Sequence, residues 1–362
     1  MRLPTMQTKF AWIGLSVAFL VVGCFGRGQE ESVRETSRDT KTRGAPSSMA
    51  HSAGDRVRTD DFLATRREDY RRAIERAESW LVDLDVRPWT LREQGLKGKK
   101  KLTALLDVYV RLMKVAGPEK KAEYREEIDK LADITRQSRY HNMEEVSLEH
   151  FKEDSTSYLR AAYLLDQAGV DISYFRPEIE QINDELDAHM QLRGSHQQMV
   201  FDWYYEYFGL EKPYDMSRGF EDGVIASRYE PWQYDNRLNV YHLTHEIYVP
   251  YRFGDRLETD FFDADDRKYL ERVVPWVLIH SLVEDDPDLV GELVSCMVFL
   301  DMTEHRAFRT AIDYLFQAQN DDGSWGEYSR YREHYGEYVD EGYYLHTTMV
   351  ALGALTAAFD MR

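Results

Sequence analysis

Apolar residues recur at helical spacing along most of this chain. Tyr70, Ile74 and Ala77 fall on one stripe because they lie three or four residues apart. The same period continues in later runs, at about 102–112, 119–137, 146–168, 174–192, 196–208, 238–250, 264–281, 286–301, 304–319 and 341–359. Apolar–polar alternation at strand spacing is nearly absent. The pattern predicts an all-α domain over residues 60–362, with about 12 helices if a weak candidate at 217–230 is counted.

Residues typical of helix ends mark the connections between these runs. Ser147, Ser195 and Asp263 stand where N-caps are expected, and Gly209 follows a predicted helix end. Short connections make consecutive helices antiparallel neighbours, so the chain predicts about six helical hairpins. These hairpins could close into a ring or form an open superhelix. The exception is the long irregular connection 209–236, and insertions of this kind are often functional.

The N-terminal residues 1–24 differ from this pattern. A short basic start precedes the apolar run 10–22, which ends at Gly23 and Cys24. The run is shorter than the ~20 residues of a membrane-spanning helix and predicts a signal peptide. Its ending, VVGC, resembles a bacterial lipobox, which implies that Cys24 is lipidated; an ordinary signal peptide cut elsewhere is the alternative. We therefore expect an extracytoplasmic, lipid-anchored protein, on the outer membrane if the cell has one.

Composition narrows the possible classes of function. Lys and Arg number 46 against 65 Asp and Glu, a net charge of −19, which argues against a nucleic-acid partner because no basic stripe is available for phosphates. Residues 25–59 are polar and rich in Gly, Ser and Arg, which predicts a disordered tether. After Cys24 only Cys296 remains, so a mature chain beginning at Cys24 would have no structural disulfide within its domain.

The stretch QAQNDDGSWGEY carries a recognisable spacing. Gln319, Gly323 and Trp325 match the QW motif of terpenoid cyclases and related α/α toroids. The segment 341–355, EGYYLHTTMVALGAL, resembles the last inner helix of protein prenyltransferase β-subunits, where His-Thr begins an apolar helix. The resemblance implies a single α/α toroid with inner and outer helix rings. The QW stretch itself is interpreted as a structural fastener, with Gly323 at a positive φ.

The resemblance also predicts which helices face inward. If the last hairpin runs from an outer to an inner helix, the inner helices begin near Lys100, Ser147, Ser195, Asn236, Pro287 and Glu341. In a toroid these helices run parallel, so their first turns gather at one end of a central cavity, where the helix dipoles add positive character. The polar residues predicted to gather there are Asp154, His196, His242, His245, Glu246, Glu292, Cys296 and His346.

From this collection we predict His245, Glu292, His346 and Asp154 as acid, base or ligand groups. His242 lies three residues before His245, so the two share a helix face. The histidines either hydrogen-bond within a packed layer or take part in chemistry. Glycan hydrolysis requires a pair of carboxyl groups, and Asp154 with Glu292 is the candidate pair.

Cys296, His245 and His346 together predict a zinc site, since thiolate and imidazole are good zinc ligands. The resemblance to prenyltransferases implies zinc at His346, which matches the position of that family's zinc-binding His. That family has an Asp two residues before its ligand Cys, whereas this chain has Val294 there and Glu292 one turn before Cys296. The alternative for Cys296 is a small core residue.

Two acidic stretches are interpreted as structural. Asp263–Asp266, DADD, matches the DxDD motif of class II terpene cyclases, but it opens a helix predicted to be outer. Acidic residues favour helix starts through capping and the helix dipole. The stretch 284–288, EDDPD, is interpreted as a turn before the next helix.

These observations favour an exported toroid with a polar, aromatic-lined cavity that acts on glycans or on a hydrophobic small molecule. The chain has 24 Tyr, 16 Phe and 7 Trp, and such side chains suit sugars by stacking, although most of them can serve in packing. One alternative is a non-catalytic ligand-binding or scaffold toroid at the cell envelope. Another, implied by the resemblance, is a prenyltransferase-like or terpene cyclase-like enzyme, for which an exported site lacks an obvious substrate supply.

Overall fold

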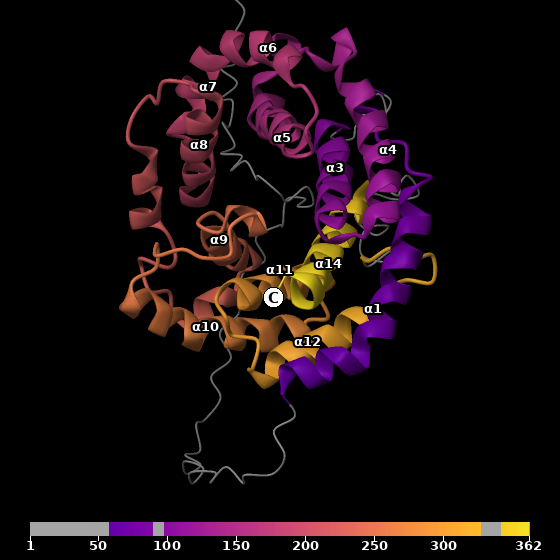
Figure 1. Ribbon diagram of the computed structural model, residues 1–362. Helices are drawn as coiled ribbons and strands as arrows, with labels where there is room; N and C mark the ends of the chain where they lie inside the picture. Colours follow the sequence, from indigo (N-terminus) through magenta and orange to yellow (C-terminus); the bar gives the residue numbers. More distant parts are fainter. Residues whose placement is uncertain (1–57, 90–97, 327–341, 362) are drawn as a thin grey trace, which may run out of the picture.

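The computed structural model describes residues 58–89, 98–326 and 342–361 of the chain. Helices are the only regular secondary structure in these ranges, so the predicted all-α fold is confirmed. The α-helices with labels in Figure 1 are α1 (Thr59–Leu81), α3 (Gly98–Val115), α4 (Pro118–Thr135), α5 (Leu148–Gln167), α6 (Arg176–Gln181), α7 (Asn183–Met190), α8 (Ser195–Phe208), α9 (Arg237–Tyr248), α10 (Ala264–Val283), α11 (Pro287–Phe299), α12 (Arg306–Gln317) and α14 (Gly342–Asp360). None of these helices combines the length and apolar composition needed to cross a membrane.

Two segments differ from the helices that the sequence predicted. The run 174–192 is divided into α6 and α7, which meet near Ile182. The weak candidate at 217–230 contains the 3-10 helix η4 (Met216–Asp222) and turns rather than an α-helix. A second 3-10 helix, η5 (Pro231–Asp235), completes the connection into α9.

Helices α3, α5, α8, α9, α11 and α14 lie toward the inside of the molecule in Figure 1, with α1, α4, α6, α7, α10 and α12 around them. Helix α14 packs against α3 and α11, α3 also packs against α5, and α9 packs against α8 and α11. Helices α5 and α8 meet at Tyr163 and Trp203, whose ring centroids are 4.6 Å apart. The starting points predicted for the inward-facing helices coincide with the first turns of this set, or lie one residue before them.

Burial explains the composition of these helices. Helix α12 is amphipathic: Ala307, Phe308, Ala311, Ile312 and Leu315 are buried on one face. Helix α11 is different because α9, α10, α12 and α14 all pack against it. Its residues are apolar and buried on nearly every side, as a fully surrounded helix requires. Acidic side chains within α11 are therefore costly to bury and need a specific explanation.

The QW stretch ties the end of α12 to α1. The Gln319 side-chain amide donates hydrogen bonds to the carbonyl oxygens of Ala73 and Gly323, each at 2.9 Å. Gly323 has a φ of 98°, as predicted. Trp325 is fully buried, and its indole N–H donates to the Leu315 carbonyl at 2.8 Å. The interpretation of this stretch as a fastener is confirmed.

The DADD stretch caps α10, as the sequence suggested. Asp263 is the N-cap, and its side chain accepts a hydrogen bond from the Asp266 backbone N–H at 2.8 Å. The Asp266 side chain pairs with Arg228 at 2.6 Å. Both carboxylates are therefore used in local structure.

Candidate functional site

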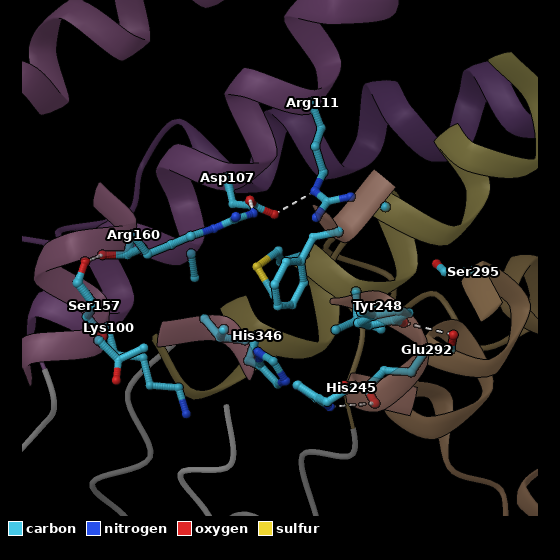
Figure 2. A pocket seen from close by; sticks show the side chains of 18 of the residues that line it. Lys100, Asp107, Arg111, Ser157, Arg160, His245, Tyr248, Glu292, Ser295 and His346 are labelled. Carbon is cyan, nitrogen blue, oxygen red and sulfur yellow. Dashed lines mark hydrogen bonds and ion pairs between the residues drawn. The ribbon is translucent and has the colours of Figure 1, made fainter. Parts of the chain in front are cut away.

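A cavity lies among α3, α5, α8, α9, α11 and α14, with about 920 Å³ of empty space when the solvent at its mouth is included. Figure 2 shows polar side chains at two opposite sides of it. Asp107, Arg111 and Arg160 form one side, and His245, Glu292 and His346 form the other. Apolar side chains line the space between them, among them Val200, Phe253, Phe299, Met349 and Val350.

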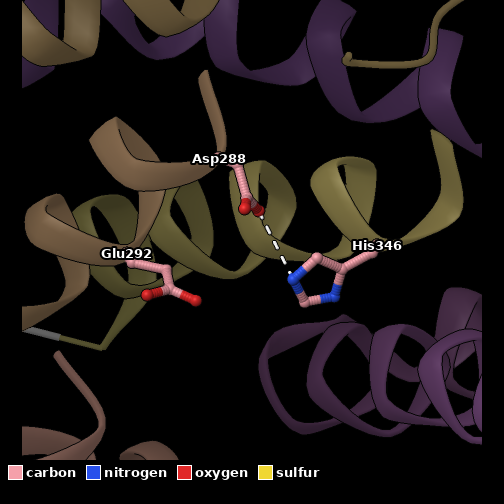
Figure 3. Close-up of side chains that lie close together, drawn as sticks. All are labelled: Asp288, Glu292 and His346. Carbon is pink, nitrogen blue, oxygen red and sulfur yellow. Dashed lines mark ion pairs between the residues drawn. The ribbon is translucent and has the colours of Figure 1, made fainter. Parts of the chain in front are cut away.

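Three side chains from two helices form a cluster beside this cavity. Asp288 and Glu292 lie one turn apart on α11, and His346 lies in the early part of α14. One ligand atom from each of the three lies within 4.8 Å of the others (Figure 3). The His346 Nε2 atom is 3.4 Å from the Asp288 Oδ1 atom. Both atoms are buried, and neither has a hydrogen-bond partner.

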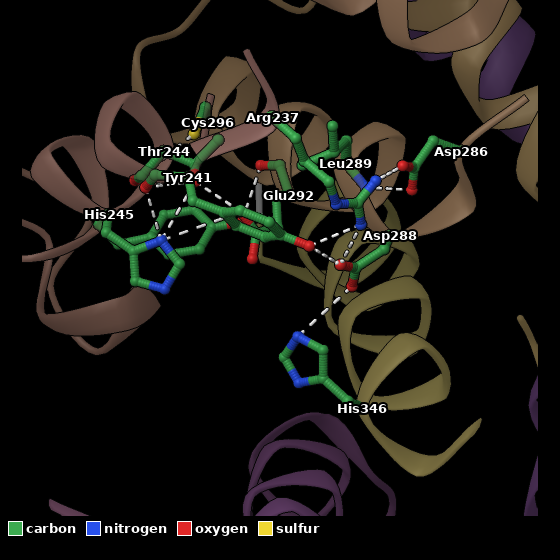
Figure 4. A network of polar contacts seen from close by, with 11 residues as sticks. Arg237, Tyr241, Thr244, His245, Asp286, Asp288, Leu289, Glu292, Cys296 and His346 are labelled. Carbon is green, nitrogen blue, oxygen red and sulfur yellow. Dashed lines mark hydrogen bonds and ion pairs between the residues drawn. The ribbon is translucent and has the colours of Figure 1, made fainter. Parts of the chain in front are cut away.

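Asp288 is held by residues of α9 (Figure 4). The Arg237 guanidinium donates to the Oδ2 atom at 3.0 Å, and the Tyr241 hydroxyl donates to the same atom. Burial alone would raise the pKa of Asp288, but positive charge on His346 and Arg237, with the Tyr241 hydrogen bond, brings it below its ordinary value. Because His346 is neutral near neutral pH, the ionised state of Asp288 depends on the charges of Arg237 and Lys100 and on the Tyr241 hydrogen bond. Arg237 also pairs with Asp286, the N-cap of α11.

Glu292 has a different environment from Asp288. The Thr244 hydroxyl donates to its Oε2 atom at 2.5 Å, and the His245 Nδ1 atom lies 3.9 Å from the same oxygen. Burial and the nearby charge of Asp288 raise the pKa of Glu292 well above its ordinary value. Without a cation between these two carboxyl groups, burial and the Asp288 charge therefore favour the protonated form of Glu292.

The two histidines of the site are neutral. The His245 Nδ1 atom lies 2.8 Å from the Tyr241 carbonyl oxygen, which can only accept, so we assign the ring proton to Nδ1. The Nε2 atom then carries a lone pair. Burial lowers the pKa of His245 to about 4 and that of His346 to about 3. Both rings line the cavity and can act as proton acceptors or ligands there.

The structure brings together three of the four residues predicted as acid, base or ligand groups: His245, Glu292 and His346. Asp154 does not line this cavity; it is buried on α5 near Tyr140, whose pKa burial and the Asp154 charge both raise. The predicted pairing of Asp154 with Glu292 is therefore not among the carboxyl pairs at the site. Asp288 is the carboxyl group next to Glu292.

The predicted zinc ligands are not gathered as a set. The buried Cys296 thiol donates to the Thr244 carbonyl at 3.9 Å, as a core residue can, and the metal-type cluster within the described residues contains Asp288 and Glu292 with His346. Sequence reasoning missed Asp288, because it was interpreted as part of a turn. Its four-residue spacing from Glu292, at the start of an otherwise apolar helix, was the available signal.

Glu246 and the remaining histidines have structural contacts. The Glu246 carboxylate accepts hydrogen bonds from the backbone N–H groups of Val224 and Ile225, each at 3.0 Å, and from the Ser195 hydroxyl at 3.1 Å. It thus fixes the long connection between α8 and α9. The His196 ring packs against His242 and His245, with centroids 4.9 and 5.3 Å apart.

The Asp288–Glu292–His346 cluster fits a divalent metal ion. It offers two carboxylates and one imidazole, a set that first-row metals such as Zn²⁺ and Mn²⁺ accept. Two carboxyl groups this close repel each other when both are ionised, and a cation between them removes that cost. The buried Asp288 Oδ1 and His346 Nε2 atoms, which have no hydrogen-bond partner, are placed as ligand atoms would be.

Residues 70–356 match the family model described as "Domain of unknown function (DUF6895)". The chain belongs to the DUF6895 family. The match extends from within α1 to within α14, so it includes every residue of the cluster. No curated protein and no solved structure matches the chain.

Proposed function

We propose that this DUF6895 protein is an α/α toroid whose central cavity holds a catalytic divalent metal ion. The toroid is supported by the succession of packed helices α3, α5, α8, α9, α11 and α14, in which α14 returns to α3. The QW stretch at Gln319–Trp325 supports it further, since it joins the outer helix α12 to α1, the first helix within the described residues.

One observation carries the metal proposal. The Asp288 Oδ1 and His346 Nε2 atoms face each other at 3.4 Å, buried and without hydrogen-bond partners, with the Glu292 carboxyl group beside them. A buried polar atom without a partner costs about 1–3 kcal/mol, so two of them at one point need a compensating group. A divalent ion bound by these three side chains would supply that compensation and act as a Lewis acid toward a ligand oxygen.

The residues around the ion site then have separable roles. Arg237 and Tyr241 hold Asp288 ionised and fix its orientation from α9. His245 presents an unprotonated Nε2 atom at the cavity and would accept a proton from a water that attacks the anomeric carbon. The glycosidic C–O bond would break in the same step, and the departing oxygen would gain a proton from solvent, to which His245 returns the one it accepted. Tyr248, whose hydroxyl donates to the Glu292 backbone carbonyl at 2.8 Å, fixes α9 against α11 next to the site.

We further propose that the ligand is a glycan unit and that the reaction is hydrolysis. The cavity has aromatic side chains between two polar sides, which suits a sugar ring with polar groups at its edges. The N-terminal residues support an extracytoplasmic location with a lipid on Cys24, where glycans are available.

Metal content of the purified full-length protein tests this function. We expect one equivalent of zinc or manganese per chain after loading and dialysis, and a loss of that equivalent in Asp288→Asn and His346→Ala. Glu246→Gln, a buried carboxylate on an inner helix outside the cluster, is the matched control and should retain the metal. Less than one equivalent of metal per chain in the wild-type protein would refute the proposed metal site.

Catalysis is tested separately with aryl glycosides on the metal-loaded protein. Replacing His245 by Gln should lower turnover by about a hundredfold, because the general base is removed, while metal content stays at one equivalent. Full metal binding without turnover of any glycoside would favour the ligand-binding alternative instead.

A further inference from the structure

On the side of the cavity opposite the Asp288–Glu292–His346 cluster, two arginine side chains share one carboxylate. Arg160 donates to the Asp107 Oδ1 atom at 2.5 Å, and the Arg111 Nε atom donates to the Oδ2 atom at 2.6 Å. One buried carboxylate therefore serves two guanidinium groups. Burial would raise the pKa of Asp107, but the two arginines hold it at about 2, so it is ionised at any physiological pH.

The neighbouring groups leave this side positively charged. Asp255 lies near Arg160 and pairs with Lys114. Lys114 and Asp255 offset each other and do not line the cavity, whereas Arg111 and Arg160 line it and share the single carboxylate of Asp107, which leaves one positive charge in excess. The side chains of Arg111 and Arg160 are 24% and 14% exposed, so this excess charge is poorly solvated and favours an anion in the adjoining cavity.

Arg160 also retains an unused donor. Its Nη1 atom is buried and has no hydrogen-bond partner. The guanidinium lies 4.9 Å from the ring centroid of Phe253 and 5.5 Å from that of Tyr163, so aromatic contacts hold it in place. The Tyr204 hydroxyl lies close to the same guanidinium and adds a further polar group at this side.

We propose that Arg111 and Arg160 bind an oxyanion of the cavity ligand, a carboxylate or a phosphate. Guanidinium groups match both oxyanions by paired N–H donors. Resting on the proposed function, this narrows the ligand to an acidic glycan unit, such as a uronic acid or a sugar phosphate. The oxyanion lies on the arginine side, the ring against the apolar middle of the cavity, and the reacting group at the Asp288–Glu292–His346 cluster (Figure 2).

Calorimetric titration of the metal-free, full-length protein with inorganic phosphate and with acetate tests the inference, with chloride at equal ionic strength as the blank. We expect one site per chain. Arg160→Lys keeps the positive charge but removes the paired N–H donors of the guanidinium, and should weaken oxyanion binding about tenfold or more. Arg193→Lys is the matched control, because Arg193 is a buried guanidinium over the Phe201 ring that does not line the cavity, and it should bind as the wild type does.

Asp107→Asn supplies a change of opposite sign. It removes the carboxylate that competes for both guanidinium groups, so oxyanion binding should become tighter, whereas a purely structural role for Arg160 predicts no gain. Binding of phosphate alone assigns a phosphate ester, and binding of acetate assigns a carboxylate; either supports the inference. Absence of binding by both probes, wild-type affinity in Arg160→Lys, or no gain in Asp107→Asn overturns it.

The same samples separate this inference from the metal proposal. Arg160→Lys should still load one equivalent of metal, and Glu292→Gln should still bind phosphate when metal-free. Phosphate binding that depends on Arg160 in a protein that binds no metal would remove the proposed function and leave the oxyanion site standing. Metal binding with no oxyanion binding would do the reverse.

Discussion

Replacing Arg237 by Met should destabilise the fold by removing the cation beside Asp286 and Asp288. Both carboxylates are about 5% exposed. After the change Asp288 keeps the Tyr241 hydrogen bond, and Asp286 keeps the Leu289 backbone N–H. Neither carboxylate keeps the Arg237 guanidinium, and the Met side chain supplies no charge in its place.

The size of the loss follows from burial. Breaking a buried ion pair by removing one partner costs about 3–5 kcal/mol. The Arg237 side chain is 21% exposed, so water screens part of its charge, and we expect the lower end, about 3 kcal/mol. Arg272→Met is the matched control: its partner is Glu230, both side chains are 55% exposed, and the expected loss is about 0.5 kcal/mol.

The loss of stability in Arg237→Met should depend on pH, and the direction follows from the pKa of Asp288. In the wild type the folded-state pKa of Asp288 is lowered, so its stabilisation is present above the unfolded-state pKa and is lost as pH falls through the folded-state pKa. Removing Arg237 takes away one of the charges that oppose the effect of burial, so the folded-state pKa of Asp288 rises in the variant. In acid, protonation of Asp288 removes the buried negative charge of the variant. The difference in stability between wild type and Arg237→Met should therefore be larger at neutral pH than at about pH 4.

Urea denaturation of the metal-free wild type, Arg237→Met and Arg272→Met at the two pH values measures this gap. A gap under about 1 kcal/mol at neutral pH would refute the claim that Arg237 neutralises buried charge. A gap of equal size at both pH values would show that the loss comes from packing against Tyr241 instead, since the guanidinium lies 5.0 Å from that ring.

Three further outcomes are expected. In urea melts, Trp325→Ala should lower the free energy of unfolding by about 4 kcal/mol, because it empties a buried site. Trp325→Phe should lower it by about 2 kcal/mol, because it keeps an aromatic ring but loses part of the ring volume and the hydrogen bond to the Leu315 carbonyl; equal losses would contradict this. Burial raises the pKa of Glu246 to about 7. The contribution of Glu246 to the free energy of unfolding is therefore present at acid pH and is lost as pH rises toward 7. Glu246→Gln should make stability less dependent on pH in this range, and an unchanged pH dependence would contradict this. Cys24→Ser should move the protein from the membrane fraction to the soluble fraction, and continued membrane attachment would refute lipidation at Cys24.

The sequence predicted the helices, and which of them lie toward the inside of the molecule, because both follow from local patterns. The spacing of apolar residues locates the helices, and the QW spacing at Gln319, Gly323 and Trp325 sets which helices face inward. Each of these signals is carried by residues close together in the chain. The division between α6 and α7 was missed because the apolar period runs through it without a Gly or an internal Pro.

The site was predicted only in part because its contacts join distant segments. His245, Glu292 and His346 were found as polar residues near the starts of inward-facing helices. Which carboxyl group stands next to Glu292 depends on side-chain direction, and Asp154 and Asp288 both lie within the first two turns of such helices. Asp288 follows Pro287, where an acidic residue ordinarily stabilises the helix start, so its second role could not be separated from the first.

Anomalous diffraction from crystals grown with zinc would locate the metal ion. We expect one strong peak at the zinc edge, bounded by the carboxyl groups of Asp288 and Glu292 and by the Nε2 atom of His346, and its absence in crystals of Asp288→Asn. A peak at another place in the molecule, or none at the cluster in the wild type, would contradict the proposed metal site.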